Sequence, residues 1–227
     1  MKKIFLKTNK KSLGFTLIEM IVAISIFAIM TALVLTKYGT FNQGVILTNL
    51  AFDVALNIRN AQSYGLNVKS AVRDDNAFDN EGTNSGVGGT YGVHFDSRNT
   101  TGNNAKFILF ADLSRPAVPN YVPGVYSTYS SRGIGGIPDE DISVTNIQKR
   151  SVIGRLCVSM ATDCSSSGTI VDTLDITFKR PDPNAIIMAG VAGANPTKWN
   201  SAEITIKAID GTIKKVLVNS TGQISVI

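Results

Sequence analysis

The sequence predicts an α+β fold in which one long N-terminal helix packs on an antiparallel β-sheet domain. Three observations predict it: residues 15–35 form an apolar run, the following residues have helical periodicity, and beyond residue 68 apolar residues alternate with a period of two. The expected parts are 1–14 as a leader, 15–35 as a transmembrane helix, 36–65 as its amphipathic continuation, and 66–227 as an extracytoplasmic antiparallel β domain.

Residues 1–14 form a basic leader without acidic residues, whose lysines are Lys2, Lys3, Lys7, Lys10 and Lys11. Positive charge beside an apolar span is retained in the cytoplasm, so the remainder of the chain is expected to cross the membrane. The chain has 22 basic and 17 acidic side chains, and removing the five leader lysines would leave 17 of each. A nucleic-acid partner is therefore not expected from the charge balance.

The segment from Phe15 to Leu35 contains 21 residues without Lys, Arg, Asp, Gly or Pro. As a helix it would span roughly 30 Å, the thickness of the hydrocarbon core. Its one charged residue, Glu19, requires a positively charged partner, and the span itself contains none. The charge is expected from another chain, most simply an α-amino group created by cleavage before Phe15. Two alternatives are a secretory signal peptide, although no A-x-A pattern follows, and an uncleaved signal anchor with an incidental glutamate.

Helical periodicity continues beyond the apolar span. Apolar residues recur at spacings of three and four, at Leu47, Leu50, Ala51, Val54, Ala55, Ile58 and Ala61. One face of this helix is therefore expected to be buried, and the helix is expected to run from Phe15 to about Tyr64, roughly 75 Å. Gly39 and Gly44 are expected bend points, and Gly65 is an expected C-terminal stop.

The rest of the chain reads as strands separated by turn residues. The predicted strands cover residues 91–95, 106–110, 151–157, 173–178, 185–188, 202–206, 214–218 and 223–227. Asp210-Gly211 is a hairpin turn signal. A segment of this length can form one core, so we predict a single β domain whose one face is covered by the helix stripe.

Cys157 and Cys164 are the two cysteines of the chain, with six residues between them. This spacing suits a short disulfide-closed loop outside the reducing cytoplasm, and two free thiols are the alternative. A zinc site is disfavoured because the one histidine, His94, is distant in sequence. We therefore predict a disulfide, with no metal site and no cofactor.

The junction between leader and apolar span resembles a known processing motif. Lys11-Ser12-Leu13-Gly14 followed by Phe15-Thr16-Leu17-Ile18-Glu19 is similar to the cleavage and methylation motif of type IV prepilins and type II secretion pseudopilins. The resemblance implies that a prepilin peptidase cuts between Gly14 and Phe15 and methylates the new Phe15 amine. It also implies that Glu19 offsets the Phe15 ammonium of a neighbouring subunit during filament assembly. Many relatives carry a proline where this chain has Thr36.

Weaker similarities extend the resemblance into the C-terminal half. They lie at Arg59-x-Ala61, Tyr91-Gly92-Val93, 107–112, Ile176-Thr177-Phe178 and the closing hairpin around Gly211 and Gly222. They resemble the GspH/FimT type of minor pseudopilin, which implies a pilin-like fold and a low-copy subunit near a filament tip. The implied location is the bacterial inner membrane, with a single pass and an extracytoplasmic C-terminal domain. The implied partners are prepilin peptidase, other pilin or pseudopilin subunits and the inner-membrane assembly platform.

Two loops carry further hypotheses. The first is rich in oxygen ligands, which suits either a calcium site or a solvated loop: Asp74, Asp75, Asn76, Asp79, Asn80 and Glu81. The second, residues 113–141, contains four prolines together with Tyr121, Tyr126 and Tyr129. Its tyrosines are expected either to form a contact surface for a partner or to lie flat over the β core.

No enzyme activity is expected, because His94 lies between Val93 and Phe95 without a nucleophile or paired carboxylates at a recognisable spacing. The expected function is structural, a minor pseudopilin of a type II secretion system. The alternative is a minor type IV pilin of a pilus for adhesion, motility or DNA uptake. DNA uptake would require a basic groove that gathers Arg73, Arg98, Arg132, Lys149, Arg150 and Arg155.

Overall fold

The computed structural model describes residues 14–67, 90–99, 102–112, 122–126, 141–147, 151–161, 164, 168–191 and 194–227, except for the side chains of residues 37–42. The chain divides into two compact units, Met1–Asn42 and Gln43–Ile227. The first unit contributes the N-terminal half of the helix, and the second contains the β strands with the C-terminal half of the helix. The predicted α+β class is confirmed.

Helix α1 extends over Leu17–Leu66 and includes Gly65, the expected stop. Gly65 has a packing role: a Cβ at this position would lie 2.6 Å from the backbone oxygen of Phe178. Because only glycine allows the helix to approach the strand this closely, Gly65 marks a contact with the sheet. The helix ends at Leu66, two residues beyond the expected end at about Tyr64. The predicted bends at Gly39 and Gly44 concern the joint between the two units and stay predictions.

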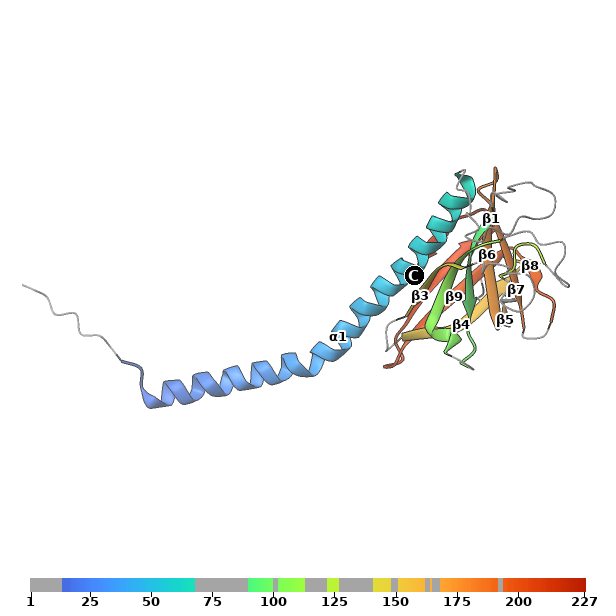
Figure 1. Ribbon diagram of the computed structural model, residues 1–227. Coiled ribbons are helices and arrows are strands. Elements are labelled where there is room, and N and C mark those ends of the chain that lie inside the picture. The colour runs from blue at the N-terminus through green and yellow to red at the C-terminus, as the bar shows by residue number, and fades with distance from the viewer. Residues whose placement is uncertain are drawn as a thin grey trace, which may run out of the picture. The chain divides into compact units, whose positions relative to one another are not determined.

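The β domain consists of two antiparallel sheets (Figure 1). The first has the strand order β3-β2-β1-β6-β7-β8, formed by Asp141–Asn146, Lys106–Ala111, Thr90–Asp96, Thr173–Lys179, Ala185–Gly190 and Thr197–Trp199. The second has the order β11-β10-β9-β4-β5, formed by Ile224–Val226, Ile213–Asn219, Ser201–Ala208, Ser151–Ser159 and Thr169–Val171. Residues Asn103–Ala105 form the short 3-10 helix η1 before β2. The division of the domain into two sheets was not predicted.

All eight predicted strands are confirmed, and within the described residues three further strands were missed. The missed strands are β3, β5 and β8, and each lies at the edge of its sheet. An edge strand has one hydrogen-bonded neighbour and is largely solvent-exposed, so it needs less of the apolar alternation on which the prediction depends. The predicted hairpin is confirmed, since Gly211 has a φ of 88° and its N–H donates to the carbonyl of Ala208 at 3.0 Å.

The core lies between the inner faces of the two sheets and the C-terminal half of α1, which Figure 1 shows alongside the strands. All seven residues of the predicted helix stripe are buried in it. They share one cluster with inward-facing strand residues such as Phe95, Ile176 and Ile204. At the end of the stripe, the rings of Tyr64 and Tyr91 meet edge to face with centroids 5.8 Å apart. Each fully buried leucine or isoleucine contributes about 1.5 to 3 kcal/mol, so the stripe fixes the helix to the sheets.

Candidate functional site

The first turn of α1 begins directly after the predicted cleavage position, and Thr16 caps it. The Thr16 hydroxyl accepts the Glu19 backbone N–H at 3.3 Å, and Glu19 Oε2 accepts the Thr16 backbone N–H at 2.9 Å. The Thr16 hydroxyl also donates to Oε2 at 2.8 Å. This is a capping box, in which threonine and the glutamate three residues later satisfy each other's backbone donors. This local role of Glu19 was not predicted, although the T-x-x-E pattern signals it.

The two predicted processing residues precede this turn and are accessible. Gly14 is exposed, with no atom within 4 Å of the position that a Cβ would occupy, and the Phe15 side chain is 83% exposed. Both hydrogen bonds that Glu19 accepts end on Oε2, and Oε1 accepts none from the described part of the chain. The cap therefore leaves one oxygen of the carboxylate available to a donor from another chain.

The apolar segment Leu17–Thr36 is long and apolar enough to cross a membrane, with a mean hydropathy of 2.5. None of it is buried against the described part of the chain. The core helix of a soluble protein would be mostly covered, whereas these side chains require lipid or another protein. The N-terminal helix thus has the properties of a membrane anchor.

The amphipathic half of α1 has a second apolar face. Val45, Phe52 and Leu56 are 44, 58 and 55% exposed. Their spacing of seven and four residues, at about 100° per residue, places them on the side of the helix opposite to the buried stripe. This exposed face was not predicted, because its three apolar residues form a weaker helical pattern than the seven of the buried stripe. Large exposed side chains that share one helix face indicate contact with another chain.

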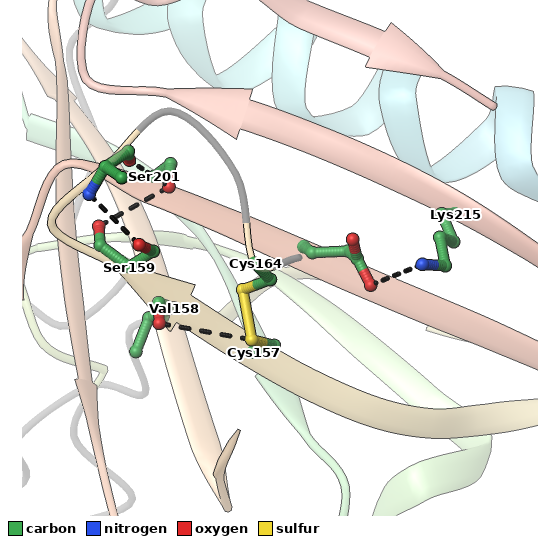
Figure 2. Close-up of a disulfide and its surroundings, with 8 residues drawn as sticks. Cys157, Val158, Ser159, Cys164, Ser201 and Lys215 are labelled. Carbon is green, nitrogen blue, oxygen red and sulfur yellow. Dashed lines mark hydrogen bonds and ion pairs between the residues drawn. A yellow bond between two sulfur atoms is a disulfide. The ribbon is translucent and has the colours of Figure 1, made fainter. Parts of the chain in front are cut away.

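Cys157 and Cys164 form the predicted disulfide, with Cα atoms 6.3 Å apart (Figure 2). Both residues are buried, and Gly168 lies against them. A Cβ at Gly168 would collide with the Cys157 sulfur and would lie 2.8 Å from the Cys164 sulfur. The backbone that follows β4 is held to β9, because the Ser201 hydroxyl donates to the carbonyl of Ala161 at 2.7 Å. The disulfide is therefore a structural brace within a packed region.

A second arrangement of functional side chains lies in a cleft of about 250 Å³ over β1, β2 and β6. His94 Nδ1 lies 2.7 Å from Asp175 Oδ1, and the Asp175 carboxylate also accepts the Tyr126 N–H at 3.3 Å. Among the described residues that line the cleft, none is a serine or a cysteine. The lining Thr173 hydroxyl donates to the carbonyl of Gly190 at 3.4 Å. The His94–Asp175 pair therefore links β1 to β6 and, through the Tyr126 N–H, holds the segment Val122–Tyr126 on the sheet.

The same cleft contains an ion pair between Asp96 and Arg98, which are two residues apart in the sequence. Arg98 donates to both carboxylate oxygens of Asp96, from Nε at 2.9 Å and from Nη2 at 2.7 Å, and Asn103 donates at 3.0 Å. Burial acts to raise the pKa of Asp96, but the hydrogen bonds from Arg98 and Asn103 outweigh it and lower the pKa from its ordinary value. Asp96 is therefore charged at neutral pH and holds Arg98 against the sheet.

The described segment Val122–Tyr126 belongs to the proline- and tyrosine-rich loop. The Gly124 N–H donates to Asp112 Oδ2 at 2.8 Å, and the Tyr126 ring packs on Phe110 and His94 with centroid distances of 5.4 and 4.7 Å. Tyr126 thus packs on side chains of β1 and β2, which for this residue agrees with the hypothesis that the tyrosines cover the β core. Tyr121, Tyr129 and the acidic cluster of residues 74–81 lie outside the described residues.

The structure also tests, within the described residues, whether basic residues gather into a DNA groove and whether acidic residues gather into a metal site. Of the six basic residues that a DNA groove would have to gather, Arg98 and Arg155 are described. Arg98 follows β1 of the first sheet and pairs with Asp96, whereas Arg155 lies on β4 of the second sheet. The other four lie outside the described residues. Within the described ranges, no group of three or more histidine, cysteine, aspartate or glutamate side chains is placed to hold a metal ion.

Comparison with known proteins identifies the N-terminal segment. Residues 9–35 match the family model of the prokaryotic N-terminal methylation motif. No curated protein and no solved structure matches the chain significantly. The matched segment contains Gly14, Phe15 and Glu19 and the first part of the exposed apolar helix. The motif implies processing by a prepilin peptidase and assembly with pilin subunits. The chain therefore carries, at residues 9–35, the N-terminal signal of type IV pilins and pseudopilins, which continues into an apolar helix.

Proposed function

We propose that this protein is a minor pseudopilin, a structural subunit of the pilus-like filament of a type II secretion system. A prepilin peptidase cleaves it between Gly14 and Phe15 and methylates the Phe15 amine. The apolar helix anchors the subunit in the inner membrane by a single pass, with the β domain outside the cytoplasm. The protein acts by assembly and carries out no catalysis. Its partners are the other pseudopilins and the inner-membrane assembly platform.

The observation that carries this proposal is that the processing motif continues directly into an apolar helix whose side chains are exposed. The segment Leu17–Thr36 has no cover from its own described chain, and the opposite face of the amphipathic half exposes Val45, Phe52 and Leu56. A subunit inserted among parallel helices would cover both surfaces at once. An isolated anchor would leave the second face in water, at a cost of about 25 cal/mol for each Å² of exposed apolar surface.

The carboxylate of Glu19 supports the same reading. Its Oε2 is used by the Thr16 cap, while Oε1 accepts no hydrogen bond from the described residues. In the apolar surroundings of a membrane, a charged oxygen needs a cationic or hydrogen-bonding partner. The ammonium of a neighbour's Phe15 supplies both a positive charge and N–H donors. Capping of its own helix and pairing with a neighbour are therefore compatible roles for one side chain.

Mass spectrometry of the mature N-terminus tests the processing step. The full chain is co-expressed with a prepilin peptidase, and the expected product begins at Phe15 with a methylated amine. A Gly14→Val variant should remain at full length, since a branched side chain replaces the small residue before the cut. A wild-type chain that begins at Met1, or that is cut elsewhere, would refute the assignment.

A matched pair of variants tests assembly. Glu19→Gln keeps an oxygen for the Thr16 cap but removes the charge, whereas Thr16→Ala removes the two hydrogen bonds of the capping hydroxyl and keeps the charge. Assembly is measured by disulfide crosslinking between neighbouring subunits in the membrane. We expect Glu19→Gln to abolish crosslinking and Thr16→Ala to retain most of it. Equal loss in both variants would show that Glu19 acts through helix capping alone.

Deletion of the gene in its own host separates the secretion machine from a pilus. Accumulation of exported proteins in the periplasm, with surface motility unchanged, is the expected result. Loss of motility or of DNA uptake with normal secretion would assign the subunit to a type IV pilus.

A further inference from the structure

One end of the β domain carries an open cleft of about 470 Å³, separate from the cleft that contains His94. Three turns form it: the β6–β7 turn, the residues between β8 and β9, and the β10–β11 turn. The side chains of Lys179, Arg180 and Lys198 contribute positive charge, and Ser220 and Thr221 contribute hydroxyl groups. The C-terminal end of α1 lies at the same end of the domain, where Gln62 contacts two of these turns.

The charge of this cleft is strongly asymmetric. Lys179, Arg180 and Lys198 are exposed, and none of them pairs with a carboxylate among the residues that the structure describes. The one acidic lining residue, Asp182, is occupied locally, because its oxygens accept the backbone N–H of Asn184 at 2.9 Å and the Asn184 amide at 3.2 Å. The lining therefore has an excess of two positive charges, in a chain whose basic and acidic residues are equal in number once the leader is removed.

The backbone around the cleft is held by hydrogen bonds that cross between the two sheets. The Ser220 N–H donates to the carbonyl of Asn200 at 2.7 Å, and the Ala185 N–H donates to the carbonyl of Ser220 at 2.9 Å. Gln62 Nε2 donates to the carbonyls of Pro183 at 3.1 Å and Gly222 at 3.4 Å. These bonds preorganise the three turns, and a preformed site loses less conformational entropy when a ligand binds.

Gly222 adds to this rigidity. Its φ of 82° is a conformation that side-chain-bearing residues rarely adopt, and a Cβ there would collide with the carbonyl oxygen of Pro183. The β10–β11 turn is therefore seated directly on the β6–β7 turn. The cationic groups project from a fixed frame, unlike lysines that are scattered along flexible loops.

We propose that this cleft binds a phosphate monoester group. Such a group carries a charge of about −1.5 to −2 at neutral pH, which matches the excess of two positive charges. Its oxygens accept charge-assisted hydrogen bonds from Lys179, Arg180 and Lys198 and neutral ones from the two hydroxyls. No aromatic side chain is among the described residues that line the cleft. The cleft thus lacks the stacking platform that holds single-stranded nucleic acid, and the monoester is favoured over a nucleic-acid strand.

The binding experiment uses the fluorescence of Trp199, the only tryptophan of the chain, which lies between Lys198 and Asn200. The full chain in detergent micelles is titrated with inorganic phosphate and with glucose 6-phosphate, at an ionic strength held constant with sodium chloride. The variants Arg180→Gln and Lys198→Gln each remove one cation from the cleft. Lys214→Gln is the matched control, because it removes the same charge from the far end of β10.

Saturable binding of either phosphate is expected, with affinity lowered about tenfold in Arg180→Gln and Lys198→Gln and changed less than about twofold in Lys214→Gln. Binding of both probes would show that the phosphate alone is recognised. Binding of glucose 6-phosphate alone would show that an attached sugar contributes. Tighter binding of an oligothymidylate than of glucose 6-phosphate would overturn the proposal in favour of a nucleic-acid strand. Absence of saturable binding, or equal losses in Lys214→Gln and the cleft variants, would also overturn it.

Discussion

Removal of the Cys157–Cys164 disulfide should destabilise the β domain by a calculable amount. The bridge joins residues separated by seven positions, so it closes a loop of eight residues. In the chain-entropy model, closing so short a loop lowers the conformational entropy of the unfolded chain by an amount equal to about 2.5 kcal/mol at 25 °C. Replacing both cysteines by alanine also leaves small voids, because both residues are buried, and the cost of the voids is added to the entropy term.

The measurement compares urea unfolding of the full chain in detergent under oxidising and reducing conditions, followed by Trp199 fluorescence. The reduced wild type isolates the bridge, and we expect its free energy of unfolding to fall by about 2 to 3 kcal/mol. The double variant Cys157→Ala/Cys164→Ala should unfold at still lower urea and should not respond to the reductant. A reduced wild type that unfolds at the same urea concentration as the oxidised protein would refute the loop-entropy reasoning.

Three further predictions follow from the packing and the charges. Gly168→Ala should destabilise the oxidised protein by about 1 to 3 kcal/mol, because the added methyl overlaps both sulfurs, and its effect in urea unfolding should shrink after reduction. Ile58→Ala should lower the free energy of unfolding by about 2 to 5 kcal/mol, because the side chain is fully buried. Leu56→Ala, on the exposed face, should change the free energy of unfolding of the monomer by less than about 1 kcal/mol. Equal losses in the two variants would contradict the assignment of the two helix faces. The lowered pKa of Asp96 means that its ion pair with Arg98 stabilises the fold above the unfolded-state pKa of about 4, and that this stability is lost as the pH falls through the folded-state pKa. Asp96→Asn should therefore be less stable than the wild type in urea at pH 7, with a gap that narrows below about pH 4, and a constant gap would exclude this linkage.

Much of the fold could be predicted from local patterns. The stripe from Leu47 to Ala61 has the helical period and is buried, and strands such as β7 and β10 alternate between more and less buried residues, so these local patterns indicate which side chains face the core. The short edge strands β5 and β8 have three residues each, too few for a period to be recognised. The division into two sheets was not predictable either, because strand neighbours such as β1 and β6 are far apart in sequence.

The candidate site was predictable to the extent that it is local. The motif around Gly14, Phe15 and Glu19 lies within one short stretch, and the capping box could have been read from the same stretch. The disulfide was predictable because the chain has only two cysteines. By contrast, the His94–Asp175 pair joins residues 81 positions apart, and no spacing rule connects them.

The sequence by itself determined that the chain begins with a processing signal and an apolar helix, because both depend on composition within one continuous segment. The tertiary structure alone decided which helix face is covered, which carboxylates accept hydrogen bonds, and which basic residues lie together. Gly65 illustrates the difference: its sequence context suggests a helix stop, but the Phe178 backbone beside it requires a residue without a side chain. The cleft of Lys179, Arg180 and Lys198 likewise exists only because hydrogen bonds to Ser220 and from Gln62 bring three distant turns together. Long-range pairing brings these groups together, and a one-dimensional pattern does not contain that information.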